Sequence, residues 1–323
     1  MKIRISKATP LAGLALSLAV TAQAGQPCRT DEALAALEAR HFAEARTAAE
    51  PCAATDARAA LVTGRAYLAE RNIEPAVASL EKAAALDPKS SDTQLWLGRA
   101  YGQKAMQASV FSRASLAGKV HKAFERAVEL DPSNADARLA LMEFYLQAPG
   151  IMGGSEEKAR DQAAKVRQSD PFKGYQAFGR IAEHGKRWDA ALAEYERAAR
   201  EFPKRREPAV WRANVAAQQK DYSRAFDILE AFLKAEPSQE SVCYSIGRLG
   251  AQSGERMERA EECLKRYLAH EPAKDEPPLS AAHYQLGALY DRRGNRDLAR
   301  SEYQKALALE PGHPGAREAL AKK

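Results

Sequence analysis

SAAHYQLGALYDRRGNRDLARSEYQKALALEPGH, residues 280–313, is the stretch that decides the fold of this chain. Its apolar and small residues recur every three to four positions, which is the period of an amphipathic helix. The pattern breaks near Gly294, resumes, and closes on a proline, so we expect two helices joined by a tight turn. The positions that carry the pattern are Leu286, Gly287, Tyr290, Ala299, Tyr303, Ala306 and Pro311.

The same pattern returns along the chain. Pro203 and Pro237 stand 34 residues apart, and each lies 12 residues after an alanine, Ala191 and Ala225 respectively. The segment that ends at Pro88 fits the same frame. A unit of this length is a helix pair that cannot bury its apolar face alone and must stack on copies of itself. The sequence therefore predicts an all-α solenoid of stacked antiparallel helix pairs, without strands.

These units resemble the tetratricopeptide repeat, whose pattern is W-x2-L-G-x2-Y, then A-x3-F and a closing proline. The resemblance covers about residues 57–313, as about seven units. It implies a right-handed superhelical solenoid whose first helices line a concave groove. Trp96 and Trp211 depart from the pattern, because they stand two positions later than the family's tryptophan.

Further segments complete the predicted organisation. Residues 25–56 are expected to form a degenerate N-terminal repeat or cap, and residues 314–323 a short capping helix. The stretch 272–279 contains three prolines and is predicted to be a surface loop between repeats. The insertions into the repeat pattern are placed near residues 102–119, 147–155 and 273–279.

The first 24 residues have the pattern of a cleaved signal peptide. A basic start (Lys2, Arg4 and Lys7) precedes an apolar run at 11–20 and a small-residue cleavage site at 22–24. Ten apolar residues are too few to span a bilayer. We therefore expect a periplasmic mature chain without an integral membrane segment, from a bacterial cell envelope.

The charge of the chain argues against nucleic acid as a partner. The formal net charge is +6, and removal of the signal leaves about +3. That excess is too small to hold a phosphate backbone, and an exported protein does not normally meet one.

Four cysteines in an exported chain indicate disulfides, for which three pairings exist. Cys28 precedes one short expected helix and Cys52 follows the returning one, so antiparallel packing would place them side by side. Cys243 and Cys263 fall on the first and second expected helices of one later repeat, at positions that antiparallel packing of the two helices brings together. We predict the bridges Cys28–Cys52 and Cys243–Cys263, with four buried thiols as the alternative.

The family resemblance also predicts where a ligand lies. In this family the ninth and thirteenth positions of each unit commonly face the concave groove, and the fifth position does so as well. The resulting groove residues are Arg65, Arg99, Arg180, Asn214, Arg248, Gln103, Gln147, Gln218, Gln252, Tyr244 and Tyr284. Guanidinium groups hold carboxylates and glutamine amides hold a peptide backbone, so an acidic peptide or a free C-terminus is the expected partner. The alternative is that these arginines form ordinary ion pairs with neighbouring helices.

The insertion near 102–119 is expected to lengthen both helices of its unit and to project their hairpin. Phe111 near the tip is a possible partner anchor. The alternative is that the apolar residues of the insertion pack on the adjacent extended loop of the third unit.

No pattern in the sequence indicates catalysis. The six histidines are scattered without metal-ligand spacing, and motifs for nucleophiles or dinucleotides are missing. We therefore expect neither an enzyme nor a cofactor or metal. The predicted function is an exported scaffold or chaperone-like adaptor that binds a peptide or protein segment in its groove. The alternative is a binding protein for a non-protein envelope ligand, such as a polysaccharide or wall fragment.

Overall fold

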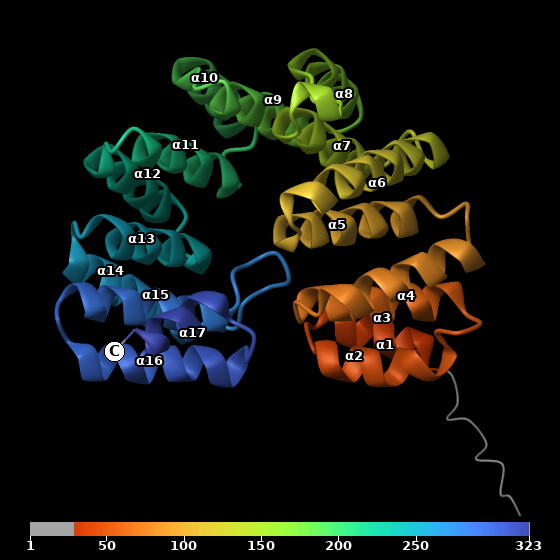
Figure 1. Ribbon diagram of the computed structural model, residues 1–323. Coiled ribbons are helices and arrows are strands. Elements are labelled where there is room, and N and C mark those ends of the chain that lie inside the picture. Colours follow the sequence, from red (N-terminus) through yellow and green to blue (C-terminus); the bar gives the residue numbers. More distant parts are fainter. Residues whose placement is uncertain (1–28, 323) are drawn as a thin grey trace, which may run out of the picture.

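The computed structural model describes residues 29–322 and is entirely helical over that range. Seventeen α-helices and two short 3-10 helices follow one another in these residues, and no strand occurs among them. Successive helices pack antiparallel and the pairs stack into a curved solenoid (Figure 1). The predicted all-α solenoid of stacked helix pairs is confirmed.

The helices of the N-terminal half are α1 (Thr30–Glu38), α2 (Phe42–Ala49), η1 (Glu50–Cys52), α3 (Ala57–Ala69), α4 (Ile73–Leu86), α5 (Ser91–Gln107), α6 (Val110–Leu130), α7 (Ala135–Gln147), η2 (Gly150–Met152) and α8 (Glu156–Ser169). The helices of the C-terminal half are α9 (Pro171–His184), α10 (Trp188–Glu201), α11 (Glu207–Gln218), α12 (Tyr222–Ala235), α13 (Glu240–Ser253), α14 (Met257–Leu268), α15 (Leu279–Arg292), α16 (Arg296–Leu309) and α17 (Pro314–Ala321).

Small residues let the two helices of each pair approach closely. A Cβ built on Gly179 of α9 would lie 2.1 Å from the ring of Tyr195 of α10, so only glycine leaves room for that ring. In the same way, a Cβ built on Gly98 of α5 would lie 2.4 Å from the ring of Phe124 of α6. The recurring glycine of the sequence pattern is therefore a packing requirement: it seats the bulky residue of the second helix.

The α5–α6 pair is longer than the others. The two helices have 17 and 21 residues, whereas α9 and α10 have 14 each. The additional turns lengthen the α5–α6 hairpin, and α6 contacts η2 of the next unit. This geometry decides the shape of the groove in the N-terminal half.

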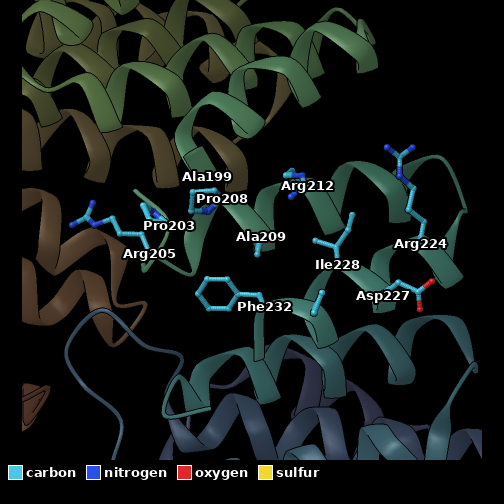
Figure 2. Close-up of a pocket in the computed structure, with 11 residues that line it drawn as sticks. Ala199, Pro203, Arg205, Pro208, Ala209, Arg212, Arg224, Asp227, Ile228 and Phe232 are labelled. Carbon is cyan, nitrogen blue, oxygen red and sulfur yellow. The ribbon is translucent and has the colours of Figure 1, made fainter. Parts of the chain in front are cut away.

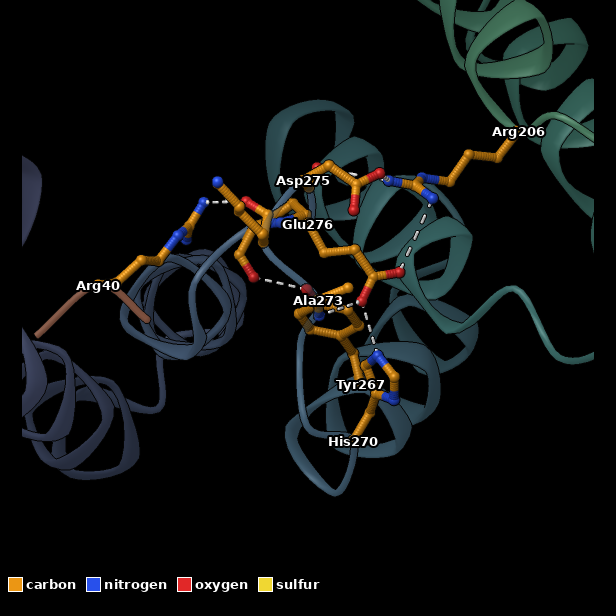
Figure 3. A network of polar contacts seen from close by, with 9 residues as sticks. Arg40, Arg206, Tyr267, His270, Ala273, Asp275 and Glu276 are labelled. Carbon is orange, nitrogen blue, oxygen red and sulfur yellow. Dashed lines mark hydrogen bonds and ion pairs between the residues drawn. The ribbon is translucent and has the colours of Figure 1, made fainter. Parts of the chain in front are cut away.

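A loop between α14 and α15 brings the two ends of the solenoid together. We call residues 270–278 the clasp. Arg40, in the turn after α1, donates from Nη2 to the carbonyl oxygen of Lys274 at 3.0 Å, and the Lys274 ammonium pairs with Glu38 at 3.1 Å. On its other side the clasp accepts a 2.5 Å hydrogen bond from Arg206 to the carboxylate of Asp275 (Figure 3).

The clasp also has a buried anchor. Glu276 is 7% exposed, and its Oε2 contacts His270 Nε2 at 2.7 Å and accepts from the amide of Ala273 at 2.9 Å (Figure 3). The expectation of a plain surface loop is thus incomplete. The prolines keep this segment out of a helix, and its polar groups then contact the α1–α2 turn on one side and the α10–α11 turn on the other.

The cysteines differ from expectation where the structure describes them. Cys243 and Cys263 lie side by side as antiparallel packing predicts, but they are free, buried thiols. Their sulfur atoms are 3.0 Å apart, whereas a disulfide is about 2.05 Å long. The predicted Cys243–Cys263 bridge is therefore wrong for this structure. Cys28 and the signal segment 1–24 lie outside the described residues, so the Cys28–Cys52 bridge stays a prediction.

Candidate functional site

Seven of the eleven predicted groove residues line one of two cavities. Arg180, Asn214, Gln218, Arg248 and Gln252 line one cavity of about 360 Å³ formed by α9, α11 and α13. Arg99 and Gln147 line a second cavity, of about 720 Å³, formed by α5, α6 and α7. The residues taken from the family positions are thus divided between two separate cavities.

In the C-terminal group the polar side chains satisfy one another. Arg180 forms an ion pair with Glu143, and Arg248 donates to the Asn214 side chain at 2.6 Å. The Gln218 amide donates to Glu183 at 2.8 Å. Burial alone would lower the pKa of Arg180, but the hydrogen bond and charge of Glu143 raise it. Here the alternative interpretation, ordinary pairing between neighbouring helices, is the correct one for Arg180.

In the N-terminal half, two guanidinium groups stack on the same indole ring. Arg65 of α3 and Arg99 of α5 lie over Trp96 of α5, with their central carbons 4.6 and 4.5 Å from the ring centroid. We call these three residues the arginine–tryptophan site. Cation–π contact of this kind orients a guanidinium without neutralising its charge.

Neither arginine of this site has a carboxylate partner in residues 29–322 within ion-pair distance. The Nε atom of Arg65 is buried and has no hydrogen-bond partner in the described part of the chain. Burial lowers the pKa of both guanidinium groups, and more distant acids such as Asp92 oppose that shift. Arginine stays charged in proteins. The arginine–tryptophan site thus holds two half-buried positive charges without an ion-pair partner in the described part of the chain.

Trp96 was missed as a functional residue at the level of sequence. It was noted only as a departure from the family pattern. Trp96 and Arg99 stand three residues apart in one helix and therefore share a face, which was the available signal. That Arg65 reaches the same ring depends on how α3 and α5 stack, and no sequence pattern contains that information.

Besides Arg65, three predicted groove residues line neither groove cavity. Tyr244 packs against Tyr267 with ring centroids 5.6 Å apart, and Tyr284 lies 4.9 Å from the His313 ring at the start of α17. Gln103 is half-buried on α5. The two tyrosines contribute to core and cap packing, so they are poor candidates for a ligand platform.

Phe111 is fully in solvent. Its side chain is 95% exposed, as is that of Ile151 in η2, while Met106 near the end of α5 is 75% exposed. The alternative that Phe111 packs on the third unit is therefore wrong. Leu116 on α6 is the residue of this insertion that reaches the core.

A further cavity, of about 380 Å³, lies between the α10–α11 turn, α11 and α12 (Figure 2). Arg205, Arg212 and Arg224 line it, with Ile228 and Phe232 on its floor (Figure 2). None of the predicted groove residues lines this cavity. It belongs to a junction between units and is separate from the groove.

The described residues show no other kind of site. No group of three or more side chains in residues 29–322 has the geometry to hold a metal ion. Over the same residues, none of the helices combines the length and apolarity needed to cross a bilayer.

Comparison with known proteins supports the repeat pattern. Models of the tetratricopeptide repeat match residues 61–114, 177–240 and 280–313. The chain is a tetratricopeptide-repeat protein. Among solved structures, this tetratricopeptide-repeat protein is similar to a thermophilic relative from Thermus thermophilus, with a TM-score of 0.50 and 19% identity over 58% of this chain and 97% of the other. Human IFIT1, solved with m7Gppp-AAAA, has a TM-score of 0.50 and 16% identity over 90% of this chain and 70% of its own. At these identities the likeness shows the fold alone.

Two curated relatives match parts of this chain. A general transcriptional corepressor, ssn6 of Schizosaccharomyces pombe, is 25% identical over 44% of this chain. A probable biofilm formation methyltransferase, WspC of Pseudomonas putida, is 42% identical over 24% of this chain. The matches span only 12% and 16% of the lengths of these two relatives. Tetratricopeptide repeats generally serve as non-enzymatic scaffolds for protein–protein interaction, and that role is the one the family supports here.

Proposed function

We propose that this protein is an exported scaffold that binds an acidic segment of another protein in the N-terminal half of its concave groove. The observation that carries the proposal is the arginine–tryptophan site. Arg65 and Arg99 are held on Trp96 at 4.6 and 4.5 Å, without a carboxylate partner in residues 29–322. Half-buried cations of this kind gain most from an incoming carboxylate, because guanidinium and carboxylate form charge-assisted hydrogen bonds.

Three properties favour a carboxylate ligand on a peptide. The two guanidinium groups are already oriented, so binding costs little additional side-chain entropy. Gln103 lies on α5, the helix of Arg99, and Gln147 lies on α7 of the next unit; their amides can pair with a peptide backbone. Tyr244 and Tyr284, which a polysaccharide would need as stacking surfaces, are instead packed against Tyr267 and His313.

Export is the part of the proposal that rests on the sequence. The basic start, apolar run and small-residue site of residues 1–24 support cleavage before Gly25 and a periplasmic location in a bacterial envelope. N-terminal sequencing of the protein from the envelope fraction tests this part directly. A mature terminus at Gly25 is expected, and an intact Met1 terminus contradicts it.

Binding is tested by photo-crosslinking in the native host. A photoreactive amino acid replaces Gln103 in the N-terminal half, and a second version carries it at Gln252 in the C-terminal half. The expected result is a protein adduct at position 103 whose crosslinked peptide is rich in Asp and Glu, and which the paired substitutions Arg65→Gln and Arg99→Gln abolish. An adduct confined to position 252, or one that carries a glycan, overturns the proposal.

A further inference from the structure

The larger of the two groove cavities is lined in part by Arg99, and its walls are mainly apolar. Met106 of α5, Val120 and Phe124 of α6, and Leu139 and Phe144 of α7 line its volume of about 720 Å³. Pockets that hold small ligands or bulky side chains have volumes of roughly 300–1,000 Å³. The cavity is therefore large enough to receive part of a bound chain.

This cavity is a product of the chain's own insertions. Its outer walls come from the additional turns of α5 and α6, which have 17 and 21 residues, and from Pro149 before η2 and Met152 at its end. A unit of ordinary length would not carry Met106 or Arg113 to these positions. The general repeat fold thus does not account for this apolar space.

Exposed apolar side chains gather at the same place. Six large hydrophobic residues are exposed in residues 29–322, and three of them, Met106, Phe111 and Ile151, belong to the α5–α6 tip and η2. Met106 lines the cavity, and Ile151 precedes Met152, which also lines it. Large apolar groups grouped in solvent are typical of interaction surfaces. Methionine in particular adapts to partners of different shape.

The charges of the cavity select the kind of partner. Asp136 and Glu143 line it, but Lys173 pairs with Asp136 at 2.7 Å and Arg180 pairs with Glu143. Arg99 and Arg113 also line it, and neither has a carboxylate partner among the described residues. The uncompensated charge of the cavity is therefore positive.

We infer that this cavity receives a large apolar side chain, such as Phe or Leu, from the same acidic segment that binds Arg65 and Arg99. The inference rests on the proposed function and specifies its ligand as a mixed acidic and apolar segment of a partner protein. The carboxylates meet Arg65, Arg99 and Arg113, and the apolar side chain enters between α5, α6 and α7. The exposed Met106, Phe111 and Ile151 then contact the flanking part of the segment.

Gly102 offers a way to fill the cavity without disturbing the fold. It lies inside α5 on the cavity wall, and a Cβ built there meets no atom within 4 Å. Gly118 inside α6 has the same free space but does not line the cavity, so it provides a matched control. Gly102→Leu and Gly118→Leu should both fold at least as well as the natural chain, because leucine is a better helix former than glycine.

The probes are short synthetic peptides in which one Phe stands at different distances from a pair of glutamates, each with a counterpart that has Ser in place of Phe. Affinities are measured by fluorescence anisotropy. We expect the best Phe peptide to bind the natural chain about tenfold more tightly than its Ser counterpart, given the apolar area of the ring. Gly102→Leu should erase this difference, and Gly118→Leu should retain it.

Methionine methyl signals provide a direct readout of the site. The chain has five methionines, of which Met106 and Met152 line the cavity while Met142 is buried in the core. In a protein labelled at its methionine methyl groups, the Phe peptide should shift the Met106 and Met152 signals and leave the Met142 signal in place. The Ser peptide should shift them much less.

The outcomes separate this inference from the proposed function. If both peptides bind equally and lose affinity in the Arg65→Gln, Arg99→Gln variant, the acidic site stands and the apolar pocket is wrong. If neither peptide binds, both are wrong. If Phe111→Ser lowers the mass of the protein in sedimentation without changing peptide affinity, the apolar surface is an interface between copies of this chain, and the inference is overturned.

Discussion

The N-terminal and C-terminal halves of the groove carry arginine at equivalent repeat positions, yet the two halves use it differently. Arg65 and Arg99 stack on Trp96 and keep their charges available. Arg180 is paired with Glu143, and Arg248 donates to Asn214 at 2.6 Å. A residue at a groove position is therefore only a candidate for binding. Its availability depends on what the preceding unit presents at the same level.

The two tryptophans show the same contrast. Trp96 and Trp211 occupy the same position in their units. The Trp96 ring contacts two guanidinium groups. The centroid of the Trp211 ring instead lies 5.1 Å from that of Tyr195 and 5.2 Å from that of Phe172. One indole contributes to a surface site and the other to the packing between units. The comparison of the two halves can be tested in four ways, beginning with the largest expected effect.

The double variant Arg65→Gln, Arg99→Gln should lose roughly 100-fold or more in affinity for an acidic peptide. Each charge-assisted hydrogen bond is worth about 1.5 kcal/mol, so losing two costs about 3 kcal/mol. The matched variant Arg180→Gln, Arg248→Gln should change affinity less than about threefold. Isothermal titration at low and moderate salt measures both, and the loss should shrink as salt rises. Equal losses in the two double variants would remove the distinction between the halves.

Trp96→Leu should weaken the same peptide by about tenfold, because it removes the ring on which both guanidinium groups are oriented, at about 0.5–1 kcal/mol for each contact. Trp211→Leu should leave affinity unchanged and instead lower the free energy of unfolding by about 1–3 kcal/mol, since it opens space beside Tyr195 and Phe172. Thermal unfolding and peptide titration of the two variants separate these effects. A purely structural loss in both variants would contradict the role given to Trp96.

The clasp joins the two halves and should weaken in acid. Burial alone would raise the pKa of Glu276, but hydrogen bonds from His270 and the Ala273 amide lower it below the usual 4.5. Because the pKa of this carboxyl is lower in the folded chain than in the unfolded chain, its ionised form stabilises the fold at pH values above the unfolded-state pKa. That stabilisation is lost as the pH falls below about 4.5. Glu276→Gln should therefore cost about 1–2 kcal/mol at neutral pH and flatten the acid part of the Tm-against-pH curve. An unchanged curve would mean that the clasp does not contribute to stability.

Glu143→Gln should make the C-terminal half behave more like the N-terminal half, with the smallest effect of the four. It frees Arg180 and also removes a carboxylate from the lining of the N-terminal cavity, so affinity for an acidic peptide should rise about two- to threefold, because an exposed pair is worth less than about 1 kcal/mol. Glu157→Gln on α8 makes the same change in net charge on an exposed residue outside both groove cavities and serves as the control. An equal gain in the two variants would show that net charge, and not the release of Arg180, is responsible.

Much of the fold was predictable because it is local. The spacing of Ala191, Tyr195 and Pro203 sets one helix pair, and its repetition requires the pairs to stack. The greater length of α5 and α6 was also predictable, because the insertion near residues 102–119 lies between the two helices of a repeat whose pattern is otherwise intact. The bridge predicted for Cys243 and Cys263 shows the limit of such reasoning, since the pattern placed the two sulfurs together but did not determine their redox state.

The sequence by itself determined the helix pairs and suggested a set of groove residues, because helical periodicity and unit length assign each position to a side of the solenoid. Only the tertiary structure decided which of those residues remain free to bind. Pairing of Arg180 with Glu143, 37 residues earlier, and the sharing of Trp96 by Arg65 and Arg99 depend on how neighbouring units rotate against one another. The clasp is more remote still, since Arg40 and Lys274 stand 234 residues apart and meet only because the curvature of each unit accumulates along the solenoid.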